Sequence, residues 1–130
     1  MKRKIIETDG APRLPLPFSQ AVKVGNLVFI SGQGPIDPKT QEVKGGIKDQ
    51  TERMLLNVKA ILEAAGTSLK NVVSTTVYLT DLKNFEAMNE VYVKFFPTDP
   101  PPRATVQAGL LRGMLIEMQC IAWVPEGKKE

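Results

Sequence analysis

The sequence predicts one α+β domain, in which two helices pack on one face of a mixed β-sheet. Its 130 residues, 42% of them hydrophobic, have the length and composition of a single ordinary domain, and we assign residues 1–130 to it. Two segments carry apolar residues at helical spacing, and short segments rich in β-branched residues lie around them. Read along the chain, these segments give the order β-β-α-β-α-β-β.

A β-hairpin is the first predicted element. Strands at 21–24 and 27–30 flank Gly25-Asn26, whose residues tolerate the positive φ of a tight hairpin turn. Before the hairpin, residues 12–17 hold three prolines, which exclude a helix and favour an extended arm. After it, residues 31–48 hold four glycines and two prolines, and we expect a long loop there.

Two amphipathic helices are predicted next. Asp49 followed by Glu52 is typical of a helix N-cap and its third residue. Apolar residues then recur at helical spacing until Gly66: Met54, Leu55, Val58, Ile61, Leu62 and Ala65. The second helix carries its apolar residues at similar spacing from Phe85 onward and ends at Pro97.

The other predicted strands lie at 72–80, 103–107 and 115–124. The first of these is rich in β-branched residues, and three prolines at 100–102 force extended chain before the second. In the last strand one face is apolar, and the opposite face is only partly polar. Because helices on one side cover only one face, we expect the other face to meet another subunit of a homo-oligomer.

Composition excludes several kinds of catalytic site. The chain has no histidine and a single cysteine, so a Ser-His-Asp or Cys-His nucleophile and a Cys/His zinc site are ruled out. Cys120 alternates onto the apolar face of the last strand, and we interpret it as core packing. Carboxylates and glycines do not have the spacing of a metal or nucleotide site, so we predict no metal and no cofactor.

Charge and hydropathy argue against nucleic acid and membrane as partners. The net charge of +3 comes from Lys2, Arg3 and Lys4, which leaves fourteen basic and fourteen acidic residues in the rest of the chain. A neutral body lacks the basic stripe of a nucleic-acid surface. The apolar runs are too short to span a bilayer, and no signal peptide is recognisable, so we expect a cytoplasmic protein.

Five short segments carry a resemblance to a known family. They are Pro17-Phe18-Ser19-Gln20-Ala21, Ile30-Ser31-Gly32-Gln33, Met88-Asn89-Glu90-Val91-Tyr92, Pro102-Arg103-Ala104 and Ile116-Glu117-Met118. In order and spacing they resemble the RidA (YjgF-like) family. The resemblance implies a chorismate-mutase-like fold and a homotrimer with clefts between adjacent subunits. It also implies hydrolysis of enamines and imines such as 2-iminobutanoate and 2-iminopropanoate to 2-oxo acids and ammonia.

Arg103 is the main candidate for binding the substrate. Its planar guanidinium suits a carboxylate, and the resemblance implies that role, whereas a surface ion pair is the ordinary alternative. The resemblance also places Ser31 and Gly32 in the cleft, although both fit a turn at the end of a strand. Asn89 is either a cleft contact or a local hydrogen-bonding residue. Thr105 points the same way as Arg103 along its strand and is a further candidate for the pocket.

Two departures from the family pattern affect the expected activity. Phe18 is a further candidate for substrate binding. Typical members carry tyrosine at this position, and losing one hydrogen bond costs about 0.5–1.5 kcal/mol. The family's Ile-Glu-Ile-Glu run becomes Ile-Glu-Met-Gln here, and the resemblance places the water-activating carboxylate at Gln119. Gln119 can hold a water but cannot accept its proton, and general-base help is worth about 100- to 10,000-fold. Glu117 sits two residues, about 6–7 Å, away, and is not expected to substitute.

Three functions therefore remain open at this stage. The first is a cofactor-independent imine deaminase with a reduced or shifted substrate range. The second is a binding or regulatory protein that keeps a pocket for a small 2-imino or 2-oxo acid but does little chemistry. The third, RNA cleavage or inhibition of translation, is disfavoured by the neutral charge of the body.

Overall fold

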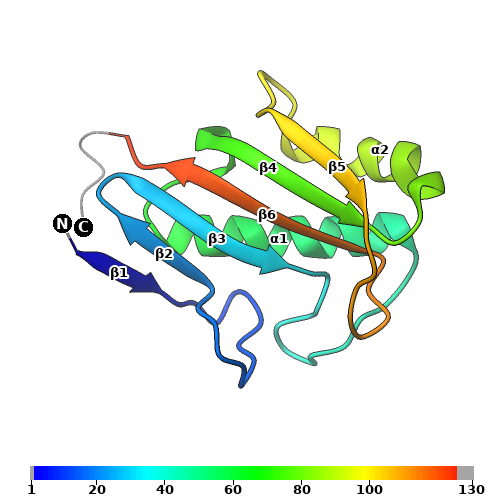
Figure 1. Cartoon of the computed structure of the whole chain (residues 1–130), viewed down its shortest axis with the longest axis horizontal. Helices are drawn as coiled ribbons and strands as arrows, with labels where there is room; N and C mark the ends of the chain where they lie inside the picture. The colour runs from blue at the N-terminus through cyan, green and yellow to red at the C-terminus, as the bar shows by residue number, and fades with distance from the viewer. Residues whose placement is uncertain (1, 126–130) are drawn as a thin grey trace.

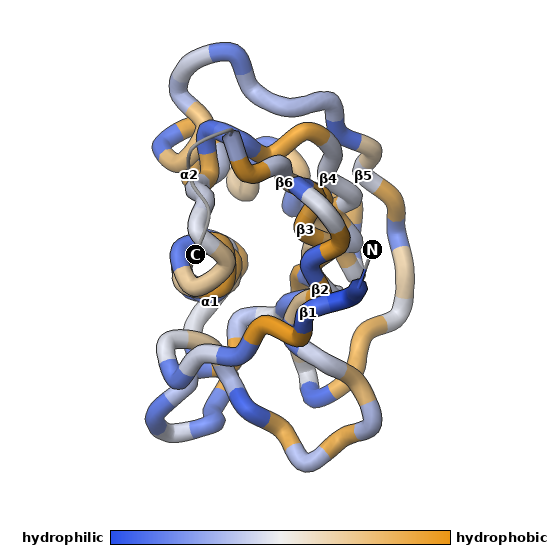
Figure 2. Tube along the Cα trace, turned by 90° about the vertical axis from the view of Figure 1, so that its left-hand side faces the viewer, coloured by the Kyte–Doolittle hydropathy of each residue, from blue (hydrophilic) through white to orange (hydrophobic). Residues whose placement is uncertain are grey.

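A computed structural model describes residues 2–125 of the chain. Six strands form one sheet in the order β1-β2-β3-β6-β4-β5. All neighbours pair antiparallel except β4 and β5, which are parallel, so the sheet is mixed as predicted. Helices α1 (Ile47–Ala64) and α2 (Phe85–Phe95) lie on the same face of the sheet (Figures 1 and 2). The predicted two-layer α+β architecture is confirmed.

The hairpin is the first predicted element that the structure contains. β2 (Ala21–Val24) and β3 (Leu27–Gln33) are joined through Gly25, whose φ of 59° is the left-handed conformation that the turn requires. β3 continues beyond Ile30 through a register shift, so the loop predicted from residue 31 begins later, after Gln33. The edge strand β1 (Arg3–Ile6) was not predicted, because its short, charged sequence carries almost no apolar alternation.

Helix α1 confirms the predicted helical periodicity but not its predicted start. The helix begins at Ile47 with Gly46 at the N-cap, and Asp49 lies in the first turn, so the prediction that Asp49 caps the helix is wrong. An acid in the first turn still interacts favourably with the helix dipole. Gly66, with a φ of 88°, follows the C-cap residue Ala65 and ends the helix where the sequence predicts.

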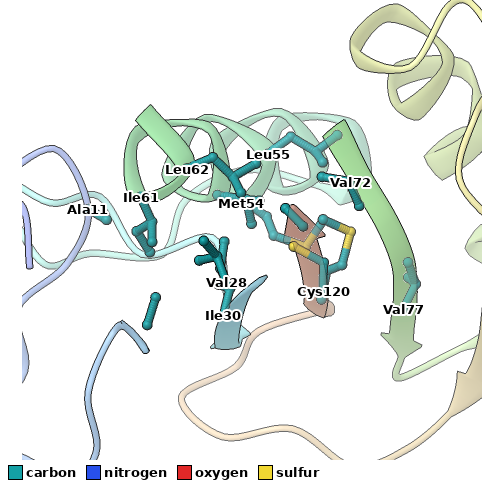
Figure 3. Close-up of a cluster of buried hydrophobic side chains, with 14 of the residues drawn as sticks. Ala11, Val28, Ile30, Met54, Leu55, Ile61, Leu62, Val72, Val77 and Cys120 are labelled. Atoms are coloured by element: carbon teal, nitrogen blue, oxygen red, sulfur yellow. The ribbon is translucent and has the colours of Figure 1, made fainter. Parts of the chain in front are cut away.

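The core lies between α1 and the covered face of the sheet. Figure 3 shows Met54 and Leu62 of α1 above Val28 of β3 and Cys120 of β6 (Ile116–Trp123). The first three side chains are fully buried, and Cys120 is 3% exposed. Cys120 belongs to the cluster of buried core residues, which confirms its interpretation as core packing. The same burial raises the pKa of its thiol to about 12.

The remaining elements complete the sheet at the edge opposite β1. β4 (Val72–Leu79) follows a 3-10 turn at Leu69–Asn71, and a second turn at Leu82–Asn84 leads into α2. β5 (Arg103–Gln107) confirms the predicted strand after the three prolines, and it pairs parallel with β4 at the edge of the sheet. Within residues 2–125, neither helix is long and apolar enough to cross a bilayer.

The face of the sheet that the helices leave uncovered, here called the outer face, carries exposed apolar side chains. Cross-strand partners share a face, so Phe29 lies on it opposite Ile121, and Leu27 lies on it opposite Trp123. Phe29 and Trp123 are 42% and 39% exposed. This apolar patch is what the sequence predicts for a subunit interface.

Candidate functional site

The guanidinium of Arg103 lies against the inner side of α2. Arg103 is the first residue of β5 and pairs with Thr75 of β4, whose side chain is buried on the helix side of the sheet. The guanidinium carbon lies 4.7 Å from the centre of the Tyr92 ring and 5.4 Å from that of Phe85. Nη1 also lies 3.8 Å from the sulfur of Met88. Arg103 is therefore held by aromatic rings and a thioether.

This arrangement leaves most donors of Arg103 available for a ligand. Within residues 2–125 the guanidinium forms no ion pair. The Tyr92 ring beneath it is fixed, because its hydroxyl lies 3.0 Å from Thr75 Oγ1 and its ring packs 4.8 Å from that of Phe96. Burial raises the pKa of Tyr92, so the ring stays neutral. An oriented and unpaired guanidinium is suited to binding a carboxylate in two-pronged fashion.

Two other predicted residues lie on the same side of the sheet as Arg103. Thr105 is two residues along β5 and pairs with buried Val77, so its half-buried side chain faces the helix layer. Asn89 is half-buried on α2, four residues after Phe85 and three before Tyr92, and so shares their side of the helix. Arg103 and Thr105 thus both face the helix layer from β5, and Asn89 lies on the side of α2 that carries the Arg103 contacts.

A pocket of about 300 Å³ lies elsewhere, where three connecting segments meet. These are the proline-rich arm before β2, the chain after β3 and the chain before β6, which lie along the lower edge of the molecule in Figure 1. Phe18, Ser31 and Gly32, all predicted as substrate-binding residues, line this pocket. Glu117 lines it as well.

Glu117 and Gly32 are in close contact in this pocket. A Cβ atom added to Gly32 would lie 2.9 Å from Glu117 Cδ and would overlap Glu117 Oε2. Only a residue without a side chain therefore leaves room for the carboxylate in this position. Burial raises the pKa of Glu117, which makes its carboxylate a stronger base than a solvated glutamate.

Ser31 has a structural role in the pocket wall. Its hydroxyl donates to the Gln20 carbonyl at 3.1 Å and accepts from Gln33 Nε2 at 3.1 Å. Gln20 is buried, and its side-chain amide donates to the carbonyls of Ala11 and Pro12 at 3.3 and 2.9 Å. Gln20 therefore anchors the proline-rich arm. Sequence reasoning missed this role, although a lone amide directly before an apolar strand is the signal that indicates it.

Gln119 does not line this pocket. It is exposed on the outer face of β6, and its Oε1 accepts a 3.0 Å hydrogen bond from the Tyr78 hydroxyl. Gln119, predicted at the water-activating position, thus lies outside the pocket, and the carboxylate that lines the pocket belongs to Glu117. Both residues share one face of β6, and only the earlier one lies beside Gly32.

The Arg103 group and the Glu117 pocket are far apart within one chain. Glu117 pairs with Tyr78 and Tyr78 with Val106, so two strand spacings, about 10 Å, separate Glu117 from β5. Arg103 lies three residues before Val106, another 10 Å or so along the strand. The two side chains also point to opposite faces of the sheet. A molecule the size of an amino acid cannot contact both within a single copy.

In the part of the chain that the structure describes, Asp37 is the other carboxylate with an altered pKa, and it stabilises a loop. The backbone N–H groups of Lys39 and Thr40 donate to Asp37 Oδ1 at 2.8 and 3.2 Å and lower its pKa. Within residues 2–125, no three His, Cys, Asp or Glu side chains are grouped so that they could hold a metal ion.

Comparison with known proteins gives consistent matches over nearly the whole chain. The model of a family described as endoribonuclease L-PSP matches residues 8–124. A RutC family protein of Pyrococcus abyssi is 52% identical over 125 residues, which is 95% of this chain and 98% of the relative. The chloroplastic Reactive Intermediate Deaminase A of Arabidopsis thaliana is 43% identical over 124 residues, 94% of this chain and 66% of that protein. A crystal structure of Escherichia coli TdcF with bound serine matches with a TM-score of 0.90 at 41% identity, covering 94% of this chain and 99% of that one.

Proposed function

Because this chain belongs to the family described as endoribonuclease L-PSP, we propose that it hydrolyses reactive enamines and imines derived from amino acids. The products are a 2-oxo acid and ammonia, and the substrates are of the 2-iminobutanoate and 2-iminopropanoate type. The observation that carries the proposal is the Arg103 guanidinium, which is held on the rings of Phe85 and Tyr92 and forms no ion pair with any residue of 2–125. The deaminase name of the Arabidopsis relative supports it. So does the serine bound to TdcF, because serine carries the same α-carboxylate as the proposed substrates.

The complete site forms between two copies of the chain, in a homotrimer. Arg103 and Glu117 lie on opposite faces of one sheet, about 10 Å apart in each of two directions. One small substrate reaches both groups only if they come from different copies. The apolar outer face, with Phe29 and Trp123 exposed, supplies surface for such an assembly.

In this site the arginine binds the substrate and the glutamate moves the proton. Arg103 of one copy binds the carboxylate and so orients the imine carbon. Glu117 of the partner subunit accepts a proton from water as the water oxygen bonds to that carbon. Because the imine nitrogen of the substrate is protonated, this addition gives a neutral carbinolamine. The same carboxyl then returns the proton to the nitrogen, and ammonia leaves with the electron pair of the C–N bond. The hydroxyl gives its own proton to the carboxylate as the carbonyl of the 2-oxo acid forms, and the carboxyl passes that proton to the ammonia. This chemistry needs no histidine, in agreement with the composition.

A rate assay with arginine variants tests the proposal. 2-Iminobutanoate is generated in situ, and its decay is followed by competition with semicarbazide. We expect Arg103→Ala to lose at least about 100-fold in kcat/KM, since both binding and orientation are lost. Arg103→Lys keeps the charge but loses the planar two-pronged geometry, so it should remain well below wild type. Arg13→Ala removes an exposed, ion-paired arginine and serves as the control. A wild-type rate no faster than that of Arg103→Ala contradicts the proposal.

A carboxylate-binding protein without catalysis is the second candidate, and Phe18 is the observation that favours it. Phe18 lines the pocket without a hydroxyl that could bind water or substrate. Titration with 2-oxobutanoate distinguishes the two functions, because this candidate predicts saturable, Arg103-dependent binding together with no turnover of the imine.

A further inference from the structure

The walls of the pocket beside Glu117 are mostly apolar. The arm before β2 contributes Leu14, Leu16 and Phe18, and the chain before β6 contributes Leu111 and Met114. Charged side chains enter at two places, Glu117 and Arg112. Arg112 is exposed, and its Nη2 donates to the Gln41 carbonyl at 3.1 Å, so it lies at the rim with a partner of its own.

The shape of the pocket is fixed by hydrogen bonds and packing. Two short backbone bonds, Leu16 N–H to the Leu14 carbonyl and Phe18 N–H to the Leu16 carbonyl, both 2.8 Å, fold the arm into consecutive turns. Proline is the central residue of each turn and restricts its φ. On the other side, a Cβ added to Gly34 would lie 3.2 Å from Met114 Cε, so Met114 packs directly against the backbone there. The pocket is thus present before any ligand binds.

We propose that this pocket receives the side chain of the substrate and gives the protein a preference for imines of amino acids with large apolar side chains. Leucine, methionine and phenylalanine are such amino acids. The inference rests on the proposed function, because it takes Glu117 as the group beside the reacting carbon. Leu14, Leu16 and Leu111 line the same pocket as Glu117 and provide apolar surface for a substituent on that carbon.

The size of the pocket supports a large substituent. A volume of about 300 Å³ corresponds to about ten water molecules in the liquid. The methyl group of 2-iminopropanoate displaces about one of them and leaves the apolar walls wet. The side chain of a leucine-derived imine adds three carbons, and each buried methylene is worth about a fourfold gain. We therefore expect at least a tenfold preference, within the range that apolar pockets achieve.

Charge in the pocket disfavours substrates with acidic side chains. A carboxylate at the end of the substrate side chain would be desolvated in this pocket close to Glu117, and like charges at short distance repel. Phe18 offers no hydroxyl that could compensate on the arm side. Imines of acidic amino acids should therefore be the poorest substrates.

The test compares two imines on the same enzyme. An L-amino acid oxidase generates the imines of leucine and alanine in situ, and kcat/KM is measured for each. A leucine-to-alanine ratio of at least about ten is expected, and a ratio near or below one overturns the proposal. Because both substrates are measured with one preparation, differences in folding or assembly cancel in the ratio.

A substitution in the exposed pocket wall tests whether this pocket causes the preference for large apolar side chains. Leu111 is 77% exposed, so Leu111→Ser removes apolar wall without disturbing the core. It should lower the leucine-to-alanine ratio about fourfold, whereas equal losses for both imines contradict the assignment. Val93→Ser on α2, where Val93 is 55% exposed and outside the pocket, is the matched control and should leave the ratio unchanged.

A binding measurement separates failure of this inference from failure of the proposed function. Calorimetric titration compares pyruvate with 4-methyl-2-oxopentanoate, the products expected from the two imines. Absence of turnover with both imines refutes the deaminase, yet tighter binding of the larger acid, reduced by Leu111→Ser, still supports the pocket assignment. Turnover of both imines at equal rates, with equal affinity for both acids, refutes the pocket assignment and leaves the deaminase intact.

Discussion

Replacing Gly32 with alanine adds one methyl group. We expect this change to lower the activity of the protein while leaving its stability nearly unchanged. The backbone of Gly32 has no left-handed φ, so alanine fits its conformation. The new Cβ would lie 2.9 Å from Glu117 Cδ and would overlap Glu117 Oε2. An ordinary contact between such atoms needs about 3.5 Å, so the carboxylate must move away by about 1 Å.

The displaced group is the end of a flexible side chain, and this determines the size of each effect. Glu117 is half-buried at the pocket wall and can rotate away without disturbing the core. Replacing glycine also reduces the freedom of the unfolded chain, worth about 0.4–1 kcal/mol, so Tm should change by no more than about 4 °C. A misplacement of about 1 Å at a reacting group can cost about 100-fold in rate. We therefore expect Gly32→Ala to fold normally and to lose about 100-fold in kcat/KM.

Two measurements on each variant test this reasoning. Thermal unfolding followed by circular dichroism gives Tm, and the semicarbazide competition assay gives kcat/KM. Gly109→Ala is the matched control, because a Cβ at Gly109 meets no atom within 4 Å, and it should keep both values. In a Glu117→Gln background, Gly32→Ala should cost little more, since the carboxylate that it displaces is already absent.

The outcome that refutes the argument is a Gly32→Ala protein with activity near wild type. The carboxylate position would then be irrelevant to catalysis, and Glu117 would lose its proposed role. A large loss of Tm together with a loss of activity would show instead that Gly32 supports the fold. Full additivity with Glu117→Gln would mean that the methyl group acts through some other atom.

Three further variants or probes follow from the same geometry. Burial raises the pKa of Glu117, so the neutral carboxyl stabilises the fold at pH values below the pKa of glutamate in the unfolded chain. This contribution to stability is lost as the pH rises through the pKa of Glu117 in the folded protein. Glu117→Gln keeps a neutral side chain at every pH, so it should raise Tm relative to wild type at about pH 8 and not at about pH 4. Phe85→Leu removes one ring beside Arg103, a cation–π contact worth about 0.5–1 kcal/mol, so KM should rise about two- to fivefold while kcat stays nearly constant, and an equal fall in kcat would argue against a binding role. A thiol reagent at about pH 8 should label Cys120 only after unfolding, because a pKa of about 12 leaves about one thiolate in 10,000, whereas rapid labelling of the native protein would contradict the buried placement.

Local sequence signals predicted most of this fold. The helical spacing of Met54 and Val58 depends only on which side of a helix is buried, and both side chains are fully buried in the structure. The hairpin followed from Gly25, because a two-residue turn restricts the backbone strongly. The resemblance to the RidA family rested on several motifs in register, and the family match over residues 8–124 confirms it. β1 was missed because an edge strand of charged residues is stabilised by backbone pairing, which has little signature in side chains.

The candidate site was harder to predict, because it depends on distances across the sheet. Alternation along β6 places Glu117 and Gln119 on one face but does not say which of them reaches the pocket. The neighbouring strand β3 determines which of the two lines the pocket. The register shift after Ile30 and the absence of a side chain at Gly32 leave space beside Glu117 and not beside Gln119. Likewise, the sequence placed Arg103 at the start of a strand but could not show that it faces the helix layer, away from that pocket. Residues that are separated in one copy can share a substrate only across an interface, so under the proposed function the pattern of one chain specifies two parts of the site, and joining them requires assembly.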